Sequence, residues 1–269
     1  MAELAHSGFL DLGTGSTTCR LAYRHWGPQA SVAPTLVLLH EGLGSADLWA
    51  DFPERLAIAT GLGVFAYSRR GYGTSSPYAL PWTFNYMHDE ATDILPLVLD
   101  AIGFREGLLI GASDGSSIAT VYAGAIPDAR VKGLVLIAPH FIAEDETAAG
   151  ANAAKVMYEQ GDMRLKLARW HANVDTAFYG WNATWTNPAF KRDWDISSYL
   201  PKITVPIRIL QGANDEYATA EQIRIAERLA RGPVEATLLP GIGHSIFREA
   251  AGETTALVAA FVPRVLPGP

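Results

Sequence analysis

Apolar and polar positions follow two patterns along the chain. Short apolar runs rich in β-branched residues predict buried parallel strands, and they span residues 35–40, 63–68, 107–111, 133–139, 206–212 and 235–240. Segments with apolar residues at helical spacing lie between most of them, and they span residues 51–59, 86–102, 116–125, 221–230 and 249–261. Strands that alternate with helices predict an α/β fold with a doubly wound, mostly parallel sheet.

Two parts of the chain depart from this alternation. Near the start, residues 8–13 and 19–27, joined by TGSTT, predict a β-hairpin that adds an antiparallel edge to the sheet. Between residues 139 and 206 there is no convincing strand. This stretch of sequence is far longer than an ordinary connection between strands, and it contains amphipathic, aromatic-rich segments. We therefore predict a helical cap inserted after the sixth strand.

This interpretation divides the chain into three parts. Residues 1–139 form the first part of the core, residues 140–203 form the cap, and residues 204–269 complete the core. No Gly/Ser-rich or Pro-rich linker separates the cap, so we treat it as part of one structural domain.

A serine stands at one predicted strand-to-helix junction. In LIGASDGSSIA, Ser113 lies between Gly111 and Gly115, after one predicted strand and just before a predicted helix. G-x-S-x-G in that setting is typical of a nucleophile elbow, because small residues permit the tight turn and the helix N-terminus favours developing negative charge. Without its flanks the pentapeptide is weak evidence, since Gly- and Ser-rich loops often contain it.

A serine hydroxyl needs a base and a group that orients the base. Asp215 in LQGANDEYAT and His244 in LPGIGHSIF both follow predicted strands, so we expect both at the sheet edge where Ser113 lies. Asp114 and Glu216 compete for the acid role. We favour Asp215, because Asp114 points away from the imidazole in a standard elbow and Glu216 lies one residue beyond the expected turn.

Backbone amides complete a site of this kind, because they hold the oxyanion of a tetrahedral intermediate. The glycine-rich turn HEGLGS follows the strand that ends at His40. We assign the oxyanion hole to the amide of Asp114 and to one amide of this turn, that of Gly42. For His40 itself we favour a structural role, with its ring hydrogen-bonded to backbone.

With HEGLGS, SRRGYGTSS, GASDG, QGANDEY and GHS in this order, the chain resembles members of the α/β-hydrolase fold superfamily over nearly its whole length outside the cap. The resemblance implies a carboxylesterase-like serine hydrolase with a Ser-Asp-His triad and no cofactor. Two positions differ from many relatives: Glu41 separates His40 from the glycine of the turn, and Ser68 stands where an Asp is common. Arg69 and Arg70 follow in a loop that we interpret as structural.

The composition limits the classes of partner. The formal net charge is −7, whereas nucleic-acid binding needs clustered Lys and Arg, so we expect no nucleic acid. Cys19 is the only cysteine and the histidines lack paired ligand spacing, so we expect no metal site. The first residues do not resemble a signal peptide, and no apolar run approaches the roughly 20 residues that span a bilayer. We expect a cytoplasmic protein that does not bind membranes.

The substrate is a small molecule on this interpretation, and a few residues are candidates to contact it. They are Leu43 in the glycine turn, His140 after a predicted strand, and the cap residues His171, Trp181 and Trp185. We expect cleavage of a small or medium, largely apolar ester, thioester or lactone. Hydrolysis of a carbon–carbon bond, as in meta-cleavage-product hydrolases, and a receptor role without catalysis are the alternatives. We leave open whether the protein forms a homodimer.

Overall fold

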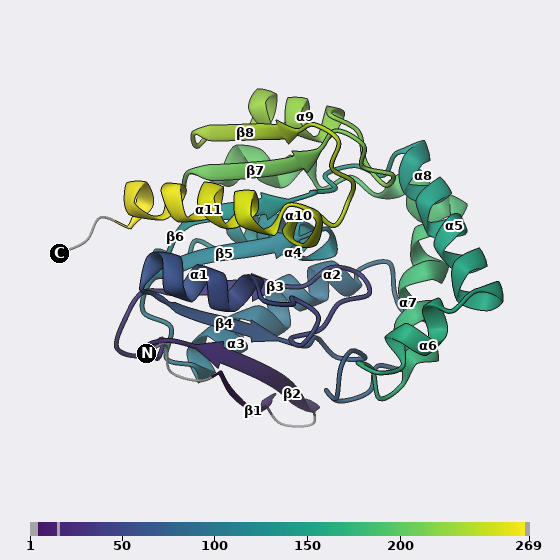
Figure 1. Ribbon diagram of the computed structural model, residues 1–269, viewed down its shortest axis with the longest axis horizontal. Helices are drawn as coiled ribbons and strands as arrows, with labels where there is room; N and C mark the ends of the chain where they lie inside the picture. The colour runs from purple at the N-terminus through teal and green to yellow at the C-terminus, as the bar shows by residue number, and fades with distance from the viewer. Residues whose placement is uncertain (1–4, 15–16, 267–269) are drawn as a thin grey trace.

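Eight strands form one sheet in the computed structural model, which describes residues 5–14 and 17–266. In chain order they are β1 His6–Thr14, β2 Thr17–Trp26, β3 Thr35–Leu39, β4 Gly63–Tyr67, β5 Gly107–Ala112, β6 Val131–Ile137, β7 Ile207–Gly212 and β8 Val234–Leu239. Their order across the sheet is β1-β2-β4-β3-β5-β6-β7-β8 (Figure 1). Strands β3 to β8 are parallel, and β2 is antiparallel to both β1 and β4. The predicted strands and hairpin are confirmed to within two residues, while residues 15 and 16 of the predicted hairpin turn lie outside the described residues.

The central strands are buried on both faces, which explains their continuous apolar sequence. Along β3, Val37 and Leu39 pack into one core cluster, whereas Leu36 and Leu38 pack into the other. Successive side chains of a strand point to opposite faces, so every side chain of a strand that is covered on both sides is buried, and apolar residues are favoured throughout.

Helices cover both faces of the sheet. They are α1 Phe52–Thr60, α2 Tyr86–Asp89, the π-helix η1 Glu90–Ile94, α3 Leu95–Ala101, α4 Asp114–Ala125, α9 Glu221–Leu229, α10 Ile246–Glu249 and α11 Ala251–Val265. In Figure 1, α1, α10 and α11 lie in front of the sheet, and α3, α4 and α9 lie behind it. The doubly wound α/β architecture is therefore as the sequence predicts.

Two predicted helices are interrupted. Residues 86–102 form α2, η1 and α3 in succession, and Pro96 near the start of α3 has no N–H with which to continue a regular helix. The sequence predicts one helix over residues 249–261, but α10 ends at Glu249, Ala250 leaves the helical conformation at φ −127° and ψ 44°, and α11 begins at Ala251. The carboxylate of Glu249 accepts the N–H groups of Gly243 and Ser245, and these bonds fix α10 against the preceding loop.

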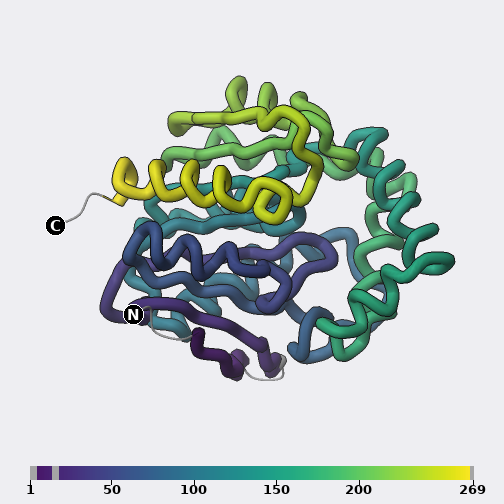
Figure 2. Tube along the Cα trace, in the orientation of Figure 1, coloured from purple at the N-terminus to yellow at the C-terminus, as the bar shows by residue number. Residues whose placement is uncertain are grey.

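The long interval between β6 and β7 is helical. It contains α5 Asp145–Gln160, α6 Met163–Leu167, α7 Val174–Trp185, α8 Pro188–Asp193 and the 3-10 helix η2 Ser197–Lys202. Helices α5 to α8 stand beyond one end of the strands, on the side opposite the two chain termini (Figures 1 and 2). An isolated antiparallel bridge between Ile142 and Asp195 brings the two ends of this segment together. The division into three parts at residues 139 and 203 stays a prediction.

None of the helices within residues 5–14 and 17–266 combines the length and apolarity that crossing a bilayer requires.

Candidate active site

Ser113 lies at the sharp turn between β5 and α4, with φ 51° and ψ −116°. A positive φ is uncommon for a residue with a side chain and marks a strained position. The turn is possible because both flanking glycines lack a Cβ. A Cβ on Gly111 would lie 2.3 Å from the Gly115 carbonyl carbon, and one on Gly115 would lie 1.9 Å from the Leu39 carbonyl oxygen. The two glycines therefore permit the close backbone packing that holds Ser113, which is 8% exposed, at the turn.

Gly115→Ala is expected to destabilise the fold by about 3 kcal/mol, because the added methyl group meets rigid backbone rather than a flexible side chain. The free energy of unfolding in urea measures this. Gly252→Ala is the matched control, since no atom lies within 4 Å of the position its Cβ would take. Equal unfolding midpoints for the two variants would show that the elbow tolerates a side chain.

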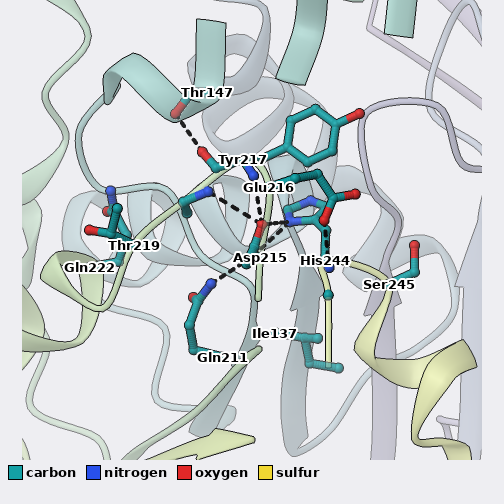
Figure 3. Close-up of polar contacts among 12 residues, drawn as sticks. Ile137, Thr147, Gln211, Asp215, Glu216, Tyr217, Thr219, Gln222, His244 and Ser245 are labelled. Carbon is teal, nitrogen blue, oxygen red and sulfur yellow. Dashed lines mark hydrogen bonds and ion pairs between the residues drawn. The ribbon is translucent and has the colours of Figure 1, made fainter. Parts of the chain in front are cut away.

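Asp215 and His244 form a close pair in loops after β7 and β8 (Figure 3). The His244 Nδ1 lies 2.8 Å from Asp215 Oδ1 and 2.9 Å from Oδ2. The carboxylate is fixed from behind, because Gln211 Nε2 donates to Oδ2 at 2.6 Å and the Tyr217 N–H donates to Oδ1 at 2.8 Å. The Asp215 side chain is 0% exposed, so its charge is directed at the imidazole.

The electrostatics of this pair follow from burial and from the contact itself. Burial acts to raise the pKa of Asp215, but the hydrogen bond and charge of His244, with the Tyr217 amide, lower it overall. For His244, burial acts to lower the pKa, and the hydrogen bond and charge of Asp215 raise it above its ordinary value. Asp215 is therefore ionised at neutral pH and stabilises the imidazolium form of His244.

Ser113 and His244 line one cavity of about 280 Å³ at the end of the sheet covered by the cap. Asp215 holds the far side of the imidazole, so the sequence-predicted triad is gathered at one place. Within residues 5–14 and 17–266, the side-chain hydrogen bonds of His244 go to Asp215 and do not include one from the Ser113 hydroxyl. Such contacts are often long before substrate binds.

The two competing acids have other partners. Asp114 accepts hydrogen bonds from the Tyr86 hydroxyl at 2.5 Å and the Trp185 indole N–H at 3.1 Å. Glu216 accepts the backbone N–H of His244 at 3.2 Å and does not bond to the ring.

Both predicted oxyanion donors border the cavity. Asp114 is the first residue of α4, so its N–H has no acceptor inside the helix. Gly42 lies in the turn after β3, and among the described residues no backbone acceptor takes its N–H. A Cβ on Gly42 would lie 2.2 Å from Trp181 Nε1, so the cap packs directly on this glycine.

Four of the five substrate-contact candidates line the cavity, namely Leu43, His140, Trp181 and Trp185. His171, the fifth candidate, does not line the cavity, so the prediction for it is wrong. Its Nδ1 accepts the Gly73 N–H at 3.0 Å and its Nε2 lies 3.1 Å from the Leu43 carbonyl, so both ring nitrogens hold loops of the core against the cap. Helical spacing in the cap does not distinguish a ring that faces the cavity from one that faces backbone.

His140 is buried at 2% exposure, and its Nδ1 contacts no described hydrogen-bond partner. Its ring centroid lies 5.3 Å from that of Trp185 and 5.6 Å from that of His244. Burial, with the charge of His244, lowers the pKa of His140 to about 3, so the ring is neutral at physiological pH.

Sequence reasoning missed several cavity residues. They are Glu41, Leu48, Thr147, Met157, Met163, Leu167, Glu216, Tyr217, Ser245 and Arg248. Arg248 pairs with Glu41 at 3.2 Å and donates to the Leu48 carbonyl, so an ion pair stands in the cavity wall. No spacing rule links residues 41 and 248, and only the fold brings them together.

The chain is similar to solved structures over nearly its full length. A membrane phospholipase A, described as a bacterial virulence factor, is 21% identical, with a TM-score of 0.76 and coverage of 97% of this chain and 87% of that one. An esterase from Rhodococcus sp. ECU1013 is 21% identical, with a TM-score of 0.69 and coverage of 97% and 99%. A proline iminopeptidase from Mycobacterium smegmatis is 18% identical, with a TM-score of 0.70 and coverage of 96% and 98%. At these identities the likeness shows the fold alone.

The sequence itself matches a family model. The model described as alpha/beta hydrolase fold matches residues 34–232, which span β3 to the end of α9 and include the whole cap. The elbow at Ser113, the strand order and this match agree, and the chain belongs to the alpha/beta hydrolase fold family.

Proposed function

We propose that the protein is a serine hydrolase that cleaves a small or medium, largely apolar ester, thioester or lactone through an acyl-enzyme on Ser113. One observation carries the proposal. Ser113, held at a strained turn, borders the same cavity as His244, and the far nitrogen of His244 is held by the buried carboxylate of Asp215. Esterases among the structural neighbours support the same class of reaction.

The reaction would use groups of this chain alone. His244 Nε2 takes the proton of the Ser113 hydroxyl as its oxygen bonds to the substrate carbonyl carbon, and Asp215 stabilises the imidazolium. The N–H groups of Gly42 and Asp114 hold the oxyanion. The intermediate then expels the alcohol, thiol or lactone oxygen, which takes the proton from His244. Water cleaves the acyl-enzyme by the same steps in reverse order.

The cavity supports a substrate of modest size. A volume of about 280 Å³ lies at the lower end of ordinary ligand pockets. Much of its wall is apolar, with contributions from Leu43, Leu48, Met157, Met163, Leu167, Trp181 and Trp185. We infer that the acyl group is short to medium in length and makes few hydrogen bonds.

Carbon–carbon bond hydrolysis is the second candidate, and Arg248 in the cavity wall is the observation that supports it. A dienoate substrate carries a carboxylate, for which an arginine is the expected partner. Arg248 already pairs with Glu41, so a substrate carboxylate would have to compete with that ion pair. We therefore rank ester hydrolysis first.

A panel of p-nitrophenyl esters from acetate to laurate, assayed beside a meta-cleavage dienoate, tests the proposal. We expect the highest kcat/KM for a short or medium acyl chain and a decrease of at least about tenfold for laurate, because a long chain exceeds the cavity. Turnover of the dienoate with none of the esters would reverse the ranking. A fluorophosphonate probe that leaves Ser113 unlabelled in folded protein would instead favour the receptor alternative.

A further inference from the structure

We propose that Arg69 positions both amides of the oxyanion hole. The inference rests on the proposed function and extends it to a residue that lies outside the cavity. A single guanidinium contacts backbone on one side of the hole and a side chain on the other. Arg69 is therefore a positioning residue, since it acts through Gly42 and Asp114 and not on the substrate.

Arg69 lies in the loop after β4 and is only 3% exposed. Its Nη1 donates to the carbonyl oxygen of His40, and its Nη2 donates to the carbonyl oxygen of Glu41 at 3.3 Å. The same Nη2 lies 3.6 Å from Asp114 Oδ2. Three acceptors around one planar group are a geometry that guanidinium satisfies and an ammonium does not.

On the first side of the hole, the contacts fix the peptide that joins Glu41 to Gly42. The Glu41 carbonyl accepts from Arg69 Nη2, from His40 Nδ1 at 2.7 Å and from the Gly44 N–H at 3.0 Å. In a trans peptide the carbonyl and the following N–H point in opposite directions. Because the Arg69 and His40 side chains, together with the Gly44 N–H, hold the Glu41 carbonyl, the Gly42 N–H points the other way, and Gly42 borders the cavity.

The tautomer of His40 agrees with this arrangement. The N–H of Arg69 donates to His40 Nε2 at 3.1 Å, so Nδ1 carries the ring proton that the Glu41 carbonyl accepts. Burial, with the charge of Arg69, holds the pKa of His40 well below its ordinary value, which keeps the ring neutral. Backbone and side chain of Arg69 thus both act on the His40–Gly42 turn.

On the second side of the hole, Arg69 is the cation beside the Asp114 carboxylate. That carboxylate is fully buried and also accepts from Tyr86 on α2 and Trp185 on α7. A buried charge that loses its partner is strongly destabilising, so the Asp114 carboxylate stays beside the Arg69 guanidinium. Fixing this side chain fixes the first residue of α4, whose N–H is the second donor.

The catalytic value of such a clamp is preorganisation. Donors that already face the oxyanion need no rearrangement as charge develops, and loss of one donor typically lowers kcat by roughly 10²- to 10³-fold. A residue that merely aligns the donors should have a smaller effect of the same kind. It should lower kcat and leave binding of the ground state nearly unchanged.

Arg69→Lys tests the proposal with a preferred ester of the panel. We expect kcat to fall about 10- to 100-fold with KM changed less than about threefold, because lysine keeps the charge but cannot reach all three acceptors. Phenylboronic acid forms a tetrahedral adduct with the serine and places an oxygen in the hole. Its inhibition constant should rise by the same factor as kcat falls, while that of butyrate, a ground-state product, stays constant.

Arg70→Lys is the matched control, because this neighbouring guanidinium lies over the Tyr78 ring and has no contact with Glu41 or Asp114. It should keep the wild-type kcat and phenylboronic acid affinity. Folded Arg69→Lys protein with both values unchanged overturns the proposal, as does an equal loss of affinity for phenylboronic acid and butyrate. If Arg69→Lys does not fold, His40→Leu decides instead, since it removes both the ring donor to the Glu41 carbonyl and the acceptor of the Arg69 N–H, and it should lower kcat about tenfold with the same inhibitor pattern.

Failure of this inference is distinguishable from failure of the proposed function. Wild-type protein that neither hydrolyses an ester nor reacts with a fluorophosphonate at Ser113 contradicts both. Wild-type protein that does both, beside an Arg69→Lys variant with wild-type kinetics, contradicts the positioning role alone.

Discussion

Ser113→Ala is expected to lower kcat/KM for the preferred ester by roughly 10⁴- to 10⁶-fold, because the members of a triad act as a unit. Removal of the hydroxyl takes away the atom that bonds to the acyl group, and the base and the oxyanion hole then have nothing to activate. The fold should be unaffected, because alanine has a Cβ like serine and meets the same backbone strain at φ 51°. Initial rates, with the melting temperature measured in parallel, provide the test.

Ser245→Ala is the matched control for this substitution. Ser245 borders the same cavity, so general damage to the pocket would affect both variants. We expect it to keep kcat within about threefold of wild type and to react normally with a fluorophosphonate. Full esterase activity in Ser113→Ala would exclude the acyl-enzyme mechanism.

Asp215→Asn is expected to lower kcat by about 10³- to 10⁴-fold through the tautomer of His244. The Tyr217 N–H donates to Oδ1, so the amide oxygen of asparagine should remain on that side. Its NH₂ group then replaces Oδ2, which lies 2.9 Å from His244 Nδ1, and donates to the ring once the Gln211 side-chain amide turns its oxygen toward this group. This favours the tautomer with the proton on Nε2, which cannot accept a proton from Ser113.

The same variant should change the pH dependence. In the proposed mechanism neutral His244 is the base, so activity should fall as the pH drops through its pKa. In the wild type, Asp215 raises that pKa above the ordinary histidine value despite burial, and the acid limb should therefore lie above about pH 6.5. In Asp215→Asn burial acts without the opposing carboxylate, so the residual activity should have its acid limb at lower pH.

Glu216→Gln is the control for kcat, because among the described residues this carboxylate accepts the backbone N–H of His244 and makes no hydrogen bond to the ring. Its charge also helps to raise the pKa of His244, so its acid limb should move to lower pH by less than that of Asp215→Asn. A pH profile of kcat/KM from pH 5 to 9 for the wild type and the two variants gives the comparison. A change in kcat of less than tenfold for Asp215→Asn, or an acid limb at unchanged pH, would contradict the assigned role.

The parts of the fold that the sequence predicts are those that local physics determines. Strands covered on both faces must be apolar throughout, and this made β3, β5 and β7 recognisable. The interruption at Ala250 was not predictable, because apolar spacing does not show that the Glu249 side chain accepts the N–H groups of Gly243 and Ser245. The π-helix η1 likewise arises within a segment whose apolar spacing is that of an ordinary helix.

Some features of the candidate site are likewise predictable from the sequence, and others are not. Ser113, Asp215 and His244 could be proposed together because each follows the carboxyl end of a strand. The partners of Asp114 and the contacts of His171 were not predicted, because Arg69, Tyr86 and Gly73 lie in other segments of the chain and no periodicity connects them. Polar contacts between distant segments could therefore not be predicted from the sequence.

The bridge between Ile142 and Asp195 has a consequence for how enzymes of this architecture diversify. The bridge pairs the two ends of the segment that contains α5 to α8. The entropic cost of closing this segment therefore depends only weakly on its length. Loop-closure entropy grows so slowly that doubling such a segment costs only about 0.6 kcal/mol. Insertions between these two residues that keep Trp181 and Trp185 packed on the core should therefore be tolerated thermodynamically, and new substrate preferences can arise there.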